Sequence, residues 1–154
     1  MSKTNQLQVD IASHSIQGLK DNNEDSVGFL VPQAVSELEN KGIVLAVADG
    51  VSSAEAGKEA SKTAITRFLS DYYQTPDTWS VKHAGQKILS SINLTLFKRS
   101  HEFVSEEKGY LTTFTALVIK SRIAHFFHAG DSRAYLLRDG ELKQLTRDHV
   151  ASIG

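Results

Sequence analysis

The sequence predicts an α+β fold in which helices pack on antiparallel sheet. Three observations support this. Short β-rich runs come first, two long segments with helical periodicity follow, and paired β-rich runs joined by hairpin turns close the chain. The change from strand period to helix period and back indicates separate blocks of sheet and helix.

The first third of the chain predicts three strands. Leu7–Ala12 alternates apolar and polar residues, as a half-exposed strand does, and Ser26–Val31 forms a second run that Pro32 ends. The polar stretch 32–42 predicts a connection. Ile43–Ala48 is apolar on both faces, which predicts a central strand.

Two long antiparallel helices should follow. The first spans Ala54–Tyr73, and "QTPDTW" ends it, so that Asp77 or Thr78 would cap the second. The second helix carries one apolar stripe, formed by Val81, Ala84, Ile88, Ile92, Leu96 and Phe103.

The last third predicts two hairpins. "TTFTALVI" and "IAHFFHAG" flank the short turn "KSR", and "RAYLLR" and "ELKQL" flank Asp139-Gly140, a strong signal for a tight hairpin turn. The sequence therefore orders three strands, two helices and four strands.

Composition limits the function classes. The 154 residues suit one domain, and 40% hydrophobic residues suffice for a core. The formal net charge is −1, from 17 basic and 18 acidic residues that are well mixed, which argues against a nucleic-acid or membrane-surface protein. The absence of cysteine excludes disulfides, thiolate metal sites and thiol catalysis. With no apolar leader or membrane span in the sequence, we expect a cytoplasmic protein.

Acidic residues stand at three strand ends. They are Glu24-Asp25 before the second strand, Asp49 at the end of the third, and Asp131 in a short loop between hairpin strands. Asp49-Gly50 alone is open to a second interpretation, because most Asp-Gly pairs only reverse the chain. Taken together, the carboxylates beside small residues favour a hard cation such as Mg²⁺ or Mn²⁺ over zinc.

Four segments in order carry a family resemblance: "GLKDNNED", "VADGVSSAEAG", "TTFTALVI" and "HAGDSRAYLLRDGELKQLTRDH". They resemble successive motifs of the metal-dependent PP2C-type (PPM) protein serine/threonine phosphatases in their bacterial form. The resemblance covers about residues 7–149. It implies a four-layer α-β-β-α sandwich, in which two antiparallel sheets face each other and a pair of long antiparallel helices covers each outer side.

The resemblance also implies the site and the reaction. Asp49 would bridge a pair of Mn²⁺ or Mg²⁺ ions, Gly50 would offer its carbonyl, and Glu24 and Asp25 would hold metal directly or through water. Asp131 matches an aspartate associated with a third, weaker ion. Water bound to these metals would attack the phosphorus of phosphoserine or phosphothreonine in proteins. We therefore expect Asp49 and Asp25, as metal ligands, to be the catalytic residues.

One position departs from the family pattern. Lys20 stands where the family has an arginine that grips phosphate, and a lysine offers a point charge instead of a planar fork. It would then bind the substrate phosphate with weaker orientation. The simpler interpretation is that Lys20 is a solvated loop residue.

Two function classes stay open at this point. The first is a phosphatase acting on a phosphoprotein, opposed by a cognate serine/threonine kinase. The second is a non-catalytic, phosphatase-like regulatory or binding module. We also expect that residues 1–154 are the N-terminal portion of a phosphatase domain, ending short of its last metal ligands. This chain would then have little or no activity and would self-associate through uncovered sheet edges.

Overall fold

The computed structural model describes residues 6–19, 22–51, 54–102 and 109–149. Its helices and strands, in chain order, are β1 (Asp25–Leu30), α1 (Val35–Lys41), β2 (Ile43–Asp49), α2 (Ala54–Tyr72), α3 (Val81–His101), β3 (Phe114–Lys120), β4 (Ile123–Ala129), β5 (Tyr135–Arg138) and β6 (Glu141–Gln144).

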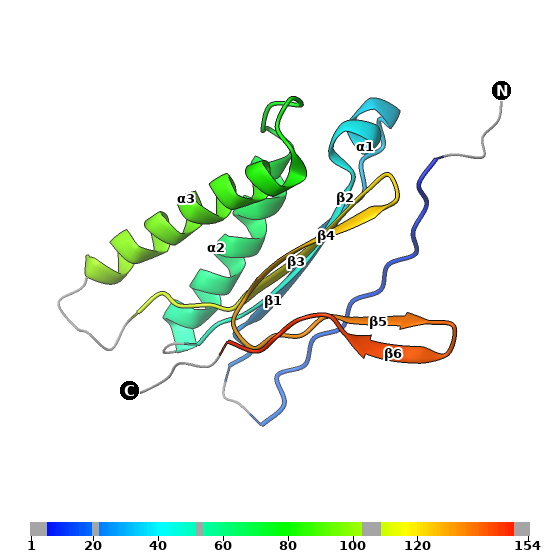
Figure 1. The fold of residues 1–154 in the computed structure, drawn as a ribbon. Helices are drawn as coiled ribbons and strands as arrows, with labels where there is room; N and C mark the ends of the chain where they lie inside the picture. The colour runs from blue at the N-terminus through cyan, green and yellow to red at the C-terminus, as the bar shows by residue number, and fades with distance from the viewer. Residues whose placement is uncertain (1–5, 20–21, 52–53, 103–108, 150–154) are drawn as a thin grey trace.

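Four of these strands form one antiparallel sheet in the order β1-β2-β3-β4, and β5 and β6 form a separate two-stranded sheet (Figure 1). Strand β2 is central. It pairs with β1 from Asp25–Asp49 to Leu30–Val44, and with β3 from Ile43–Ile119 to Val47–Thr115. Its apolar residues on both faces fit that central position.

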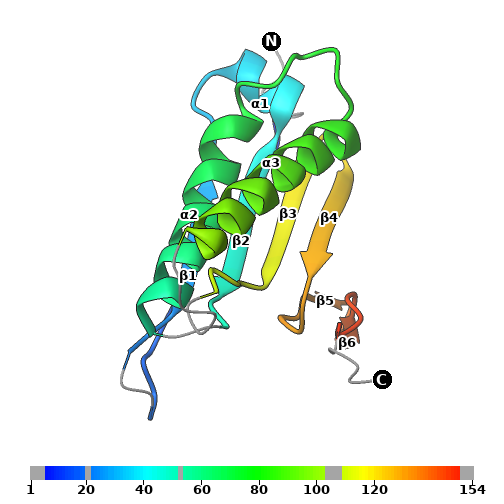
Figure 2. The same ribbon diagram turned by 90° about the vertical axis from the view of Figure 1, so that its left-hand side faces the viewer.

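Helices α2 and α3 cover one face of the four-stranded sheet, as both views show (Figures 1 and 2). The core lies between these two layers, where Phe68 of α2 contacts the rings of Phe114 and Phe127. The two helices approach the sheet very closely at two glycines. A methyl group at Gly28 would overlap side chains of α2, and one at Gly85 of α3 would overlap the Phe127 ring. The helix pair is therefore fixed tightly on the sheet.

The other face of the sheet is only partly covered. The extended segment before β1 and the β5–β6 hairpin lie on this side (Figure 1). Val27, Phe29 and Val47 on this face are 42%, 47% and 41% exposed, although each is apolar. A groove of about 570 Å³ separates the N-terminal segment from the sheet, and Asp25, Asp49 and the loop after β4 reach its wall.

Much of the sequence-based prediction is confirmed. The helical pair, the central strand and both hairpins lie where the pattern placed them. Asp139 and Gly140 have φ of 53° and 79°, the paired positive values that a two-residue primed hairpin turn requires. The predicted stripe of α3 is buried from Val81 to Leu96, and Phe103 lies outside the described residues.

Three local predictions are wrong. Residues 7–12 form no strand, since alternation alone does not make one without a neighbouring strand to pair with. The connection 32–42 contains helix α1, which buries Leu38 and ends at Gly42 with φ 81°. The order is therefore two strands, not three, before the long helices.

The cap of α3 is also different from the prediction. Ser80, not Asp77 or Thr78, begins the helix, and its hydroxyl accepts a hydrogen bond from the His83 amide at 3.1 Å. Asp77 instead faces Lys41, with 3.8 Å between the carboxylate and Nζ. Lys41 also donates to Thr75 Oγ1 and the Pro76 carbonyl, so α1 is fastened to the turn between the long helices.

The mixed α and β architecture with antiparallel sheets is as predicted. The described residues show a helical layer on a four-stranded sheet, with a small second sheet on the far side. The complete four-layer sandwich stays a prediction, as does the assignment of residues 1–154 to one phosphatase domain.

Candidate metal centre

Two aspartates face each other at one end of the sheet. Asp25 begins β1, Asp49 ends β2, and the antiparallel register makes them direct partners. Side chains of directly opposite residues lie on the same face, with Cβ atoms about 4.5–5.5 Å apart. Oδ1 of Asp49 is buried, whereas Asp25 is exposed toward the groove. Two like charges in this relation repel each other, and a cation between them would reverse that effect.

The glycine after Asp49 lets the strand end pass closely under helix α2. A methyl group at Gly50 would overlap the backbone carbonyl of Gly57, in the first turns of α2. A methyl group at Gly57 would in turn overlap the carboxylate of Glu24. The two glycines therefore bring the Glu24 carboxylate, the α2 backbone and the Asp49 strand end together.

The Glu24-Asp25 segment is held by its backbone. The Glu24 carbonyl accepts hydrogen bonds from the Gly50 amide at 3.1 Å and from the Ser61 hydroxyl at 2.6 Å. Ser61 belongs to α2 and is fully buried. Asn23 accepts from the Asp25 amide at 3.0 Å and donates to Ser15 at 2.7 Å, which ties this segment to the N-terminal stretch.

Asp131 lies in the short loop that the sequence predicts between hairpin strands: this loop runs from β4 to β5 and so joins the two sheets. Gly130 has φ 108° and lies against the Thr113 side chain. Ser132 places its hydroxyl 2.8 Å from Thr113 Oγ1, and Ser132 shares the groove wall with Asp25 and Asp49. The Asp131 loop is thus anchored at the same end of the sheet.

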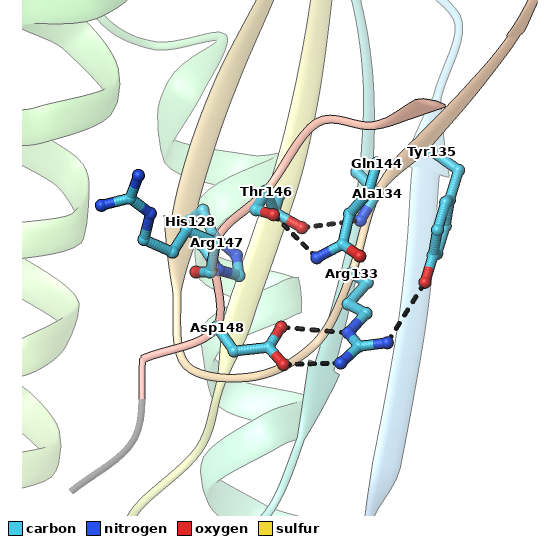
Figure 3. Close-up of polar contacts among 8 residues, drawn as sticks. All are labelled: His128, Arg133, Ala134, Tyr135, Gln144, Thr146, Arg147 and Asp148. Carbon is cyan, nitrogen blue, oxygen red and sulfur yellow. Dashed lines mark hydrogen bonds and ion pairs between the residues drawn. The ribbon is translucent and has the colours of Figure 1, made fainter. Parts of the chain in front are cut away.

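Arg133 braces the segment that follows the second hairpin (Figure 3). Its Nε and Nη2 donate to the two Asp148 carboxylate oxygens at 3.0 and 2.7 Å, and Nη1 donates to the Tyr135 hydroxyl at 3.4 Å. Hydrogen bonds from Arg133 hold the pKa of Asp148 below its usual range. The structure thus pairs Arg133 with Asp148.

Two histidines, His128 and His149, also connect the end of the described chain to β4 and its following loop. His128 Nε2 donates to the Arg147 carbonyl at 3.0 Å, and Nδ1 lies 2.8 Å from Thr115 Oγ1. The Gly130 amide donates to His149 Nδ1 at 3.2 Å, and the His149 amide donates back to the Gly130 carbonyl at 2.8 Å. Residues 147–149 therefore lie against β4 and the loop that follows it.

The donors fit a divalent cation in kind, because carboxylate and carbonyl oxygens are the ligands of Mg²⁺ and Mn²⁺. The opposed Asp25 and Asp49 give the clearest indication. Within the described ranges, no group of three His, Asp or Glu side chains is close enough together to enclose an ion. The described residues thus bring Asp25 and Asp49 together, and the metal site itself stays a prediction. Lys20, the predicted phosphate ligand, lies outside the described residues.

Comparison with known proteins places this arrangement in a family. The pattern that defines the family described as protein phosphatase 2C matches residues 12–153. The chain belongs to the protein phosphatase 2C family. Every predicted metal ligand lies within the matched range, so the family assignment covers the sheet end with its opposed aspartates.

The relatives are bacterial serine/threonine phosphatases. The chain is 35% identical over 140 residues to PstP of Mycobacterium tuberculosis, a match that covers 89% of this chain and 24% of PstP. It is 30% identical over 142 residues to the serine/threonine phosphatase stp of Listeria innocua, covering 85% of this chain and 50% of that protein. The chain thus spans a quarter to a half of the length of these relatives.

Solved structures of protein phosphatase 2C relatives share the fold. The M. tuberculosis phosphatase PstP/Ppp superposes with a TM-score of 0.66 at 29% identity, covering 88% of this chain and 52% of that chain. The catalytic domain of PstP in complex with two manganese ions gives a TM-score of 0.67 at 31% identity, covering 89% and 54%. Among the helices that the structure describes, none is long and apolar enough to cross a membrane.

Sequence reasoning missed the hydroxyl groups of Ser61, Thr113 and Ser132. Thr113 belongs to a run predicted as a strand, where threonine is common, and Ser61 lies within the first predicted helix. Their contacts join segments that are far apart in the sequence, so no local pattern identifies them.

Proposed function

We propose that the protein is a metal-dependent phosphatase that hydrolyses phosphoserine and phosphothreonine in proteins. The observation that supports this most is the pairing of Asp25 with Asp49 across β1 and β2, at the sheet end where the Gly50 and Asp131 loops also meet. The serine/threonine phosphatases among the relatives support the same reaction.

Asp49, Asp25, Glu24 and Gly50 would hold a pair of Mn²⁺ or Mg²⁺ ions, and Asp131 would hold a third. Bound metal supplies Lewis-acid activation of water and neutralises charge on the phosphoryl group. The chain's own contribution is to fix these oxygens in place through the sheet register and the close approach of Gly50 to α2. Asp49 and Asp25 are the residues on which the activity would depend most.

Lys20 is proposed to bind the substrate phosphate. A lysine ammonium attracts phosphate but lacks the two-pronged geometry of a guanidinium. We expect arginine in its place to lower KM. The substrate would be a phosphoprotein, and the reaction that must supply it is phosphoryl transfer by a serine/threonine kinase.

A second proposal concerns these 154 residues by themselves. Because the described residues contain no three-ligand group, we expect them to bind metal weakly and to turn over slowly. A non-catalytic module is the alternative function. It predicts no metal response at all, whereas the phosphatase assignment predicts a weak but specific one.

Self-association is the third proposal. The sheet face opposite α2 and α3 exposes Val27, Phe29 and Val47, together with Phe126 at 39%. Apolar side chains gathered on one sheet face favour contact with another apolar surface. We propose that a second copy of the chain covers this face in solution, which light scattering would detect as a mass above that of the monomer.

The test of the proposed function is a Mn²⁺ titration that follows the melting temperature, with phosphate release from a phosphothreonine peptide measured in parallel. We expect the wild-type melting temperature to rise at millimolar Mn²⁺ and that of Asp49→Asn to stay constant. No rise in the wild type would favour the non-catalytic module. Equal Mn²⁺-dependent phosphate release by wild type and Asp49→Asn would exclude Asp49 as a ligand.

A further inference from the structure

Thr113 connects two of the carboxylate-bearing segments through its side chain. The Asp49 amide donates to Thr113 Oγ1 at 3.0 Å. The same oxygen lies 2.8 Å from Ser132 Oγ, in the residue after Asp131. A hydroxyl has one proton and two lone pairs, so Thr113 Oγ1 can accept the Asp49 N–H and also share a hydrogen bond with Ser132, in which either oxygen can donate. One hydroxyl thus joins the Asp49 strand end to the Asp131 loop.

The surroundings hold this hydroxyl in one place. Thr113 is 6% exposed, and Gly130 lies so close to its Cβ and Cγ2 that only a glycine fits there. The Thr113 amide also donates to the Asp49 carbonyl at 2.8 Å. The backbone contact fixes the distance between the two strands, and the hydroxyl adds the connection to the loop.

The connection continues on the other side of Asp49. The Gly50 amide donates to the Glu24 carbonyl, which also accepts from Ser61. Hydrogen bonds therefore run from α2 through Glu24 and the Asp49-Gly50 segment to Thr113 and Ser132. Shared hydrogen bonds of this kind can couple segments energetically, and any such coupling acts in both directions.

We propose that Thr113 is a positioning residue whose hydroxyl sets Asp49 and the Asp131 loop relative to each other, so that its loss weakens divalent-cation binding at this sheet end. This inference rests on the proposed function for the identity of the ligand. It does not require Thr113 to touch metal or substrate.

The variants that test it are Thr113→Val, which removes the hydroxyl and keeps the branched shape, and Thr113→Ser, which restores the hydroxyl. Thr115→Val is the matched control. Thr115 is also 6% exposed, lies two residues further along on the same sheet face, and bonds to His128 instead of Asp49. Any general cost of valine at the start of β3, whether just before the strand or within it, therefore appears in the control as well.

The first readout is hydrogen exchange at the Asp49 amide in metal-free protein. Losing a net hydrogen bond of roughly 0.5–1.5 kcal/mol corresponds to exchange that is about 2- to 10-fold faster in Thr113→Val. Thr113→Ser and Thr115→Val should exchange at the wild-type rate. An Asp49 rate in Thr113→Val equal to that of Thr115→Val would overturn the inference without reference to any metal.

The second readout is Mn²⁺ affinity, measured from the electron paramagnetic resonance signal of free Mn²⁺ with the same variants and Asp49→Asn. We expect affinity to fall about 2- to 10-fold in Thr113→Val and to recover in Thr113→Ser. Loss of binding in Asp49→Asn with unchanged affinity in Thr113→Val would overturn the positioning role and leave the proposed function intact. Wild-type affinity in Asp49→Asn would overturn the proposed function, and the exchange rates alone would then decide the role of Thr113.

Discussion

Asp25 and Asp49 are direct cross-strand partners at the end of the sheet, with both carboxylates on the face that α2 and α3 leave open. A fold optimised only for stability would not place two like charges opposite each other, since such pairs are destabilising. The arrangement is understandable if the pair serves to bind a cation.

The repulsion predicts a gain in stability when one charge is removed. Asp25→Asn should raise the free energy of unfolding of the metal-free chain by about 0.2–1 kcal/mol, measured by urea denaturation. Asp10→Asn, at an exposed residue before β1, is the control. A metal-free Asp25→Asn chain less stable than the wild type would show that the two carboxylates are held apart by other contacts.

The close approach of Gly50 to α2 predicts that no side chain is tolerated there. Because the atom in the way is the backbone carbonyl of Gly57, a methyl group at Gly50 forces the strand end or the helix to move. Gly50→Ala should cost about 1–3 kcal/mol of stability, the usual range for overpacking.

Gly109→Ala is the comparison for that variant, because a methyl group there meets only the Leu111 side chain, at 3.6 Å. It should be neutral or slightly stabilising, since alanine restricts the unfolded chain. Equal urea midpoints for the two variants would mean that the β2 end and α2 can separate freely.

The buried phenol of Tyr72 should make the folded protein less stable at high pH. The side chain is 1% exposed and donates to the Lys41 carbonyl at 2.6 Å, and burial raises the pKa of Tyr72 from 10.0 to about 12. The unfolded chain ionises first as pH rises, so the contribution of this phenol is complete below pH 10 and is lost between pH 10 and about 12.

The comparison variant is Tyr72→Phe, which removes the titrating group and leaves the Lys41 carbonyl without this donor. We expect it to be about 1–3 kcal/mol less stable than the wild type at pH 7. The difference between the two should shrink above pH 10, measured by urea denaturation at several pH values. A constant difference up to pH 12 would mean that the phenol has the same pKa in both states.

The paired hydrogen bonds from the Arg133 guanidinium lead to a prediction about the pKa of Asp148. Arg133→Lys keeps the charge but cannot make both carboxylate hydrogen bonds, so the pKa of Asp148 should rise toward its ordinary value. Carboxyl carbon shifts followed by NMR against pH measure this. Arg138→Lys, in the exposed strand β5, should leave the Asp148 titration as it is in the wild type.

The parts of the fold that the sequence predicts are those with local causes. The periodicity of α2 and α3, the apolar run of β2 and the Asp139-Gly140 turn each depend on neighbouring residues, and the structure has all of them. Helix α1 was missed because only Leu38 and Lys41 are buried in it, too few to produce a clear period. The strand predicted at residues 7–12 failed because strand formation depends on a partner, which alternation does not reveal.

The candidate site likewise has features that the sequence predicts and features that it does not. Asp-Gly and the Glu-Asp pair are visible in the sequence, and the family resemblance assigns them to one place. Their direct opposition depends on the β1–β2 register, and the role of Thr113 on a contact with the loop after β4. The partner of Arg133 follows from how residues 145–149 return along that loop, which no motif specifies.

The most direct test of the metal site is paramagnetic broadening of the amide NMR signals by substoichiometric Mn²⁺, because it locates even a weakly bound ion. We predict that the Asp25, Asp49 and Gly50 signals of the wild type broaden first, that Mg²⁺ competes, and that Asp49→Asn abolishes the selectivity. Broadening centred elsewhere, or the same broadening of these signals in Asp49→Asn, would contradict the account of this sheet end as a metal centre.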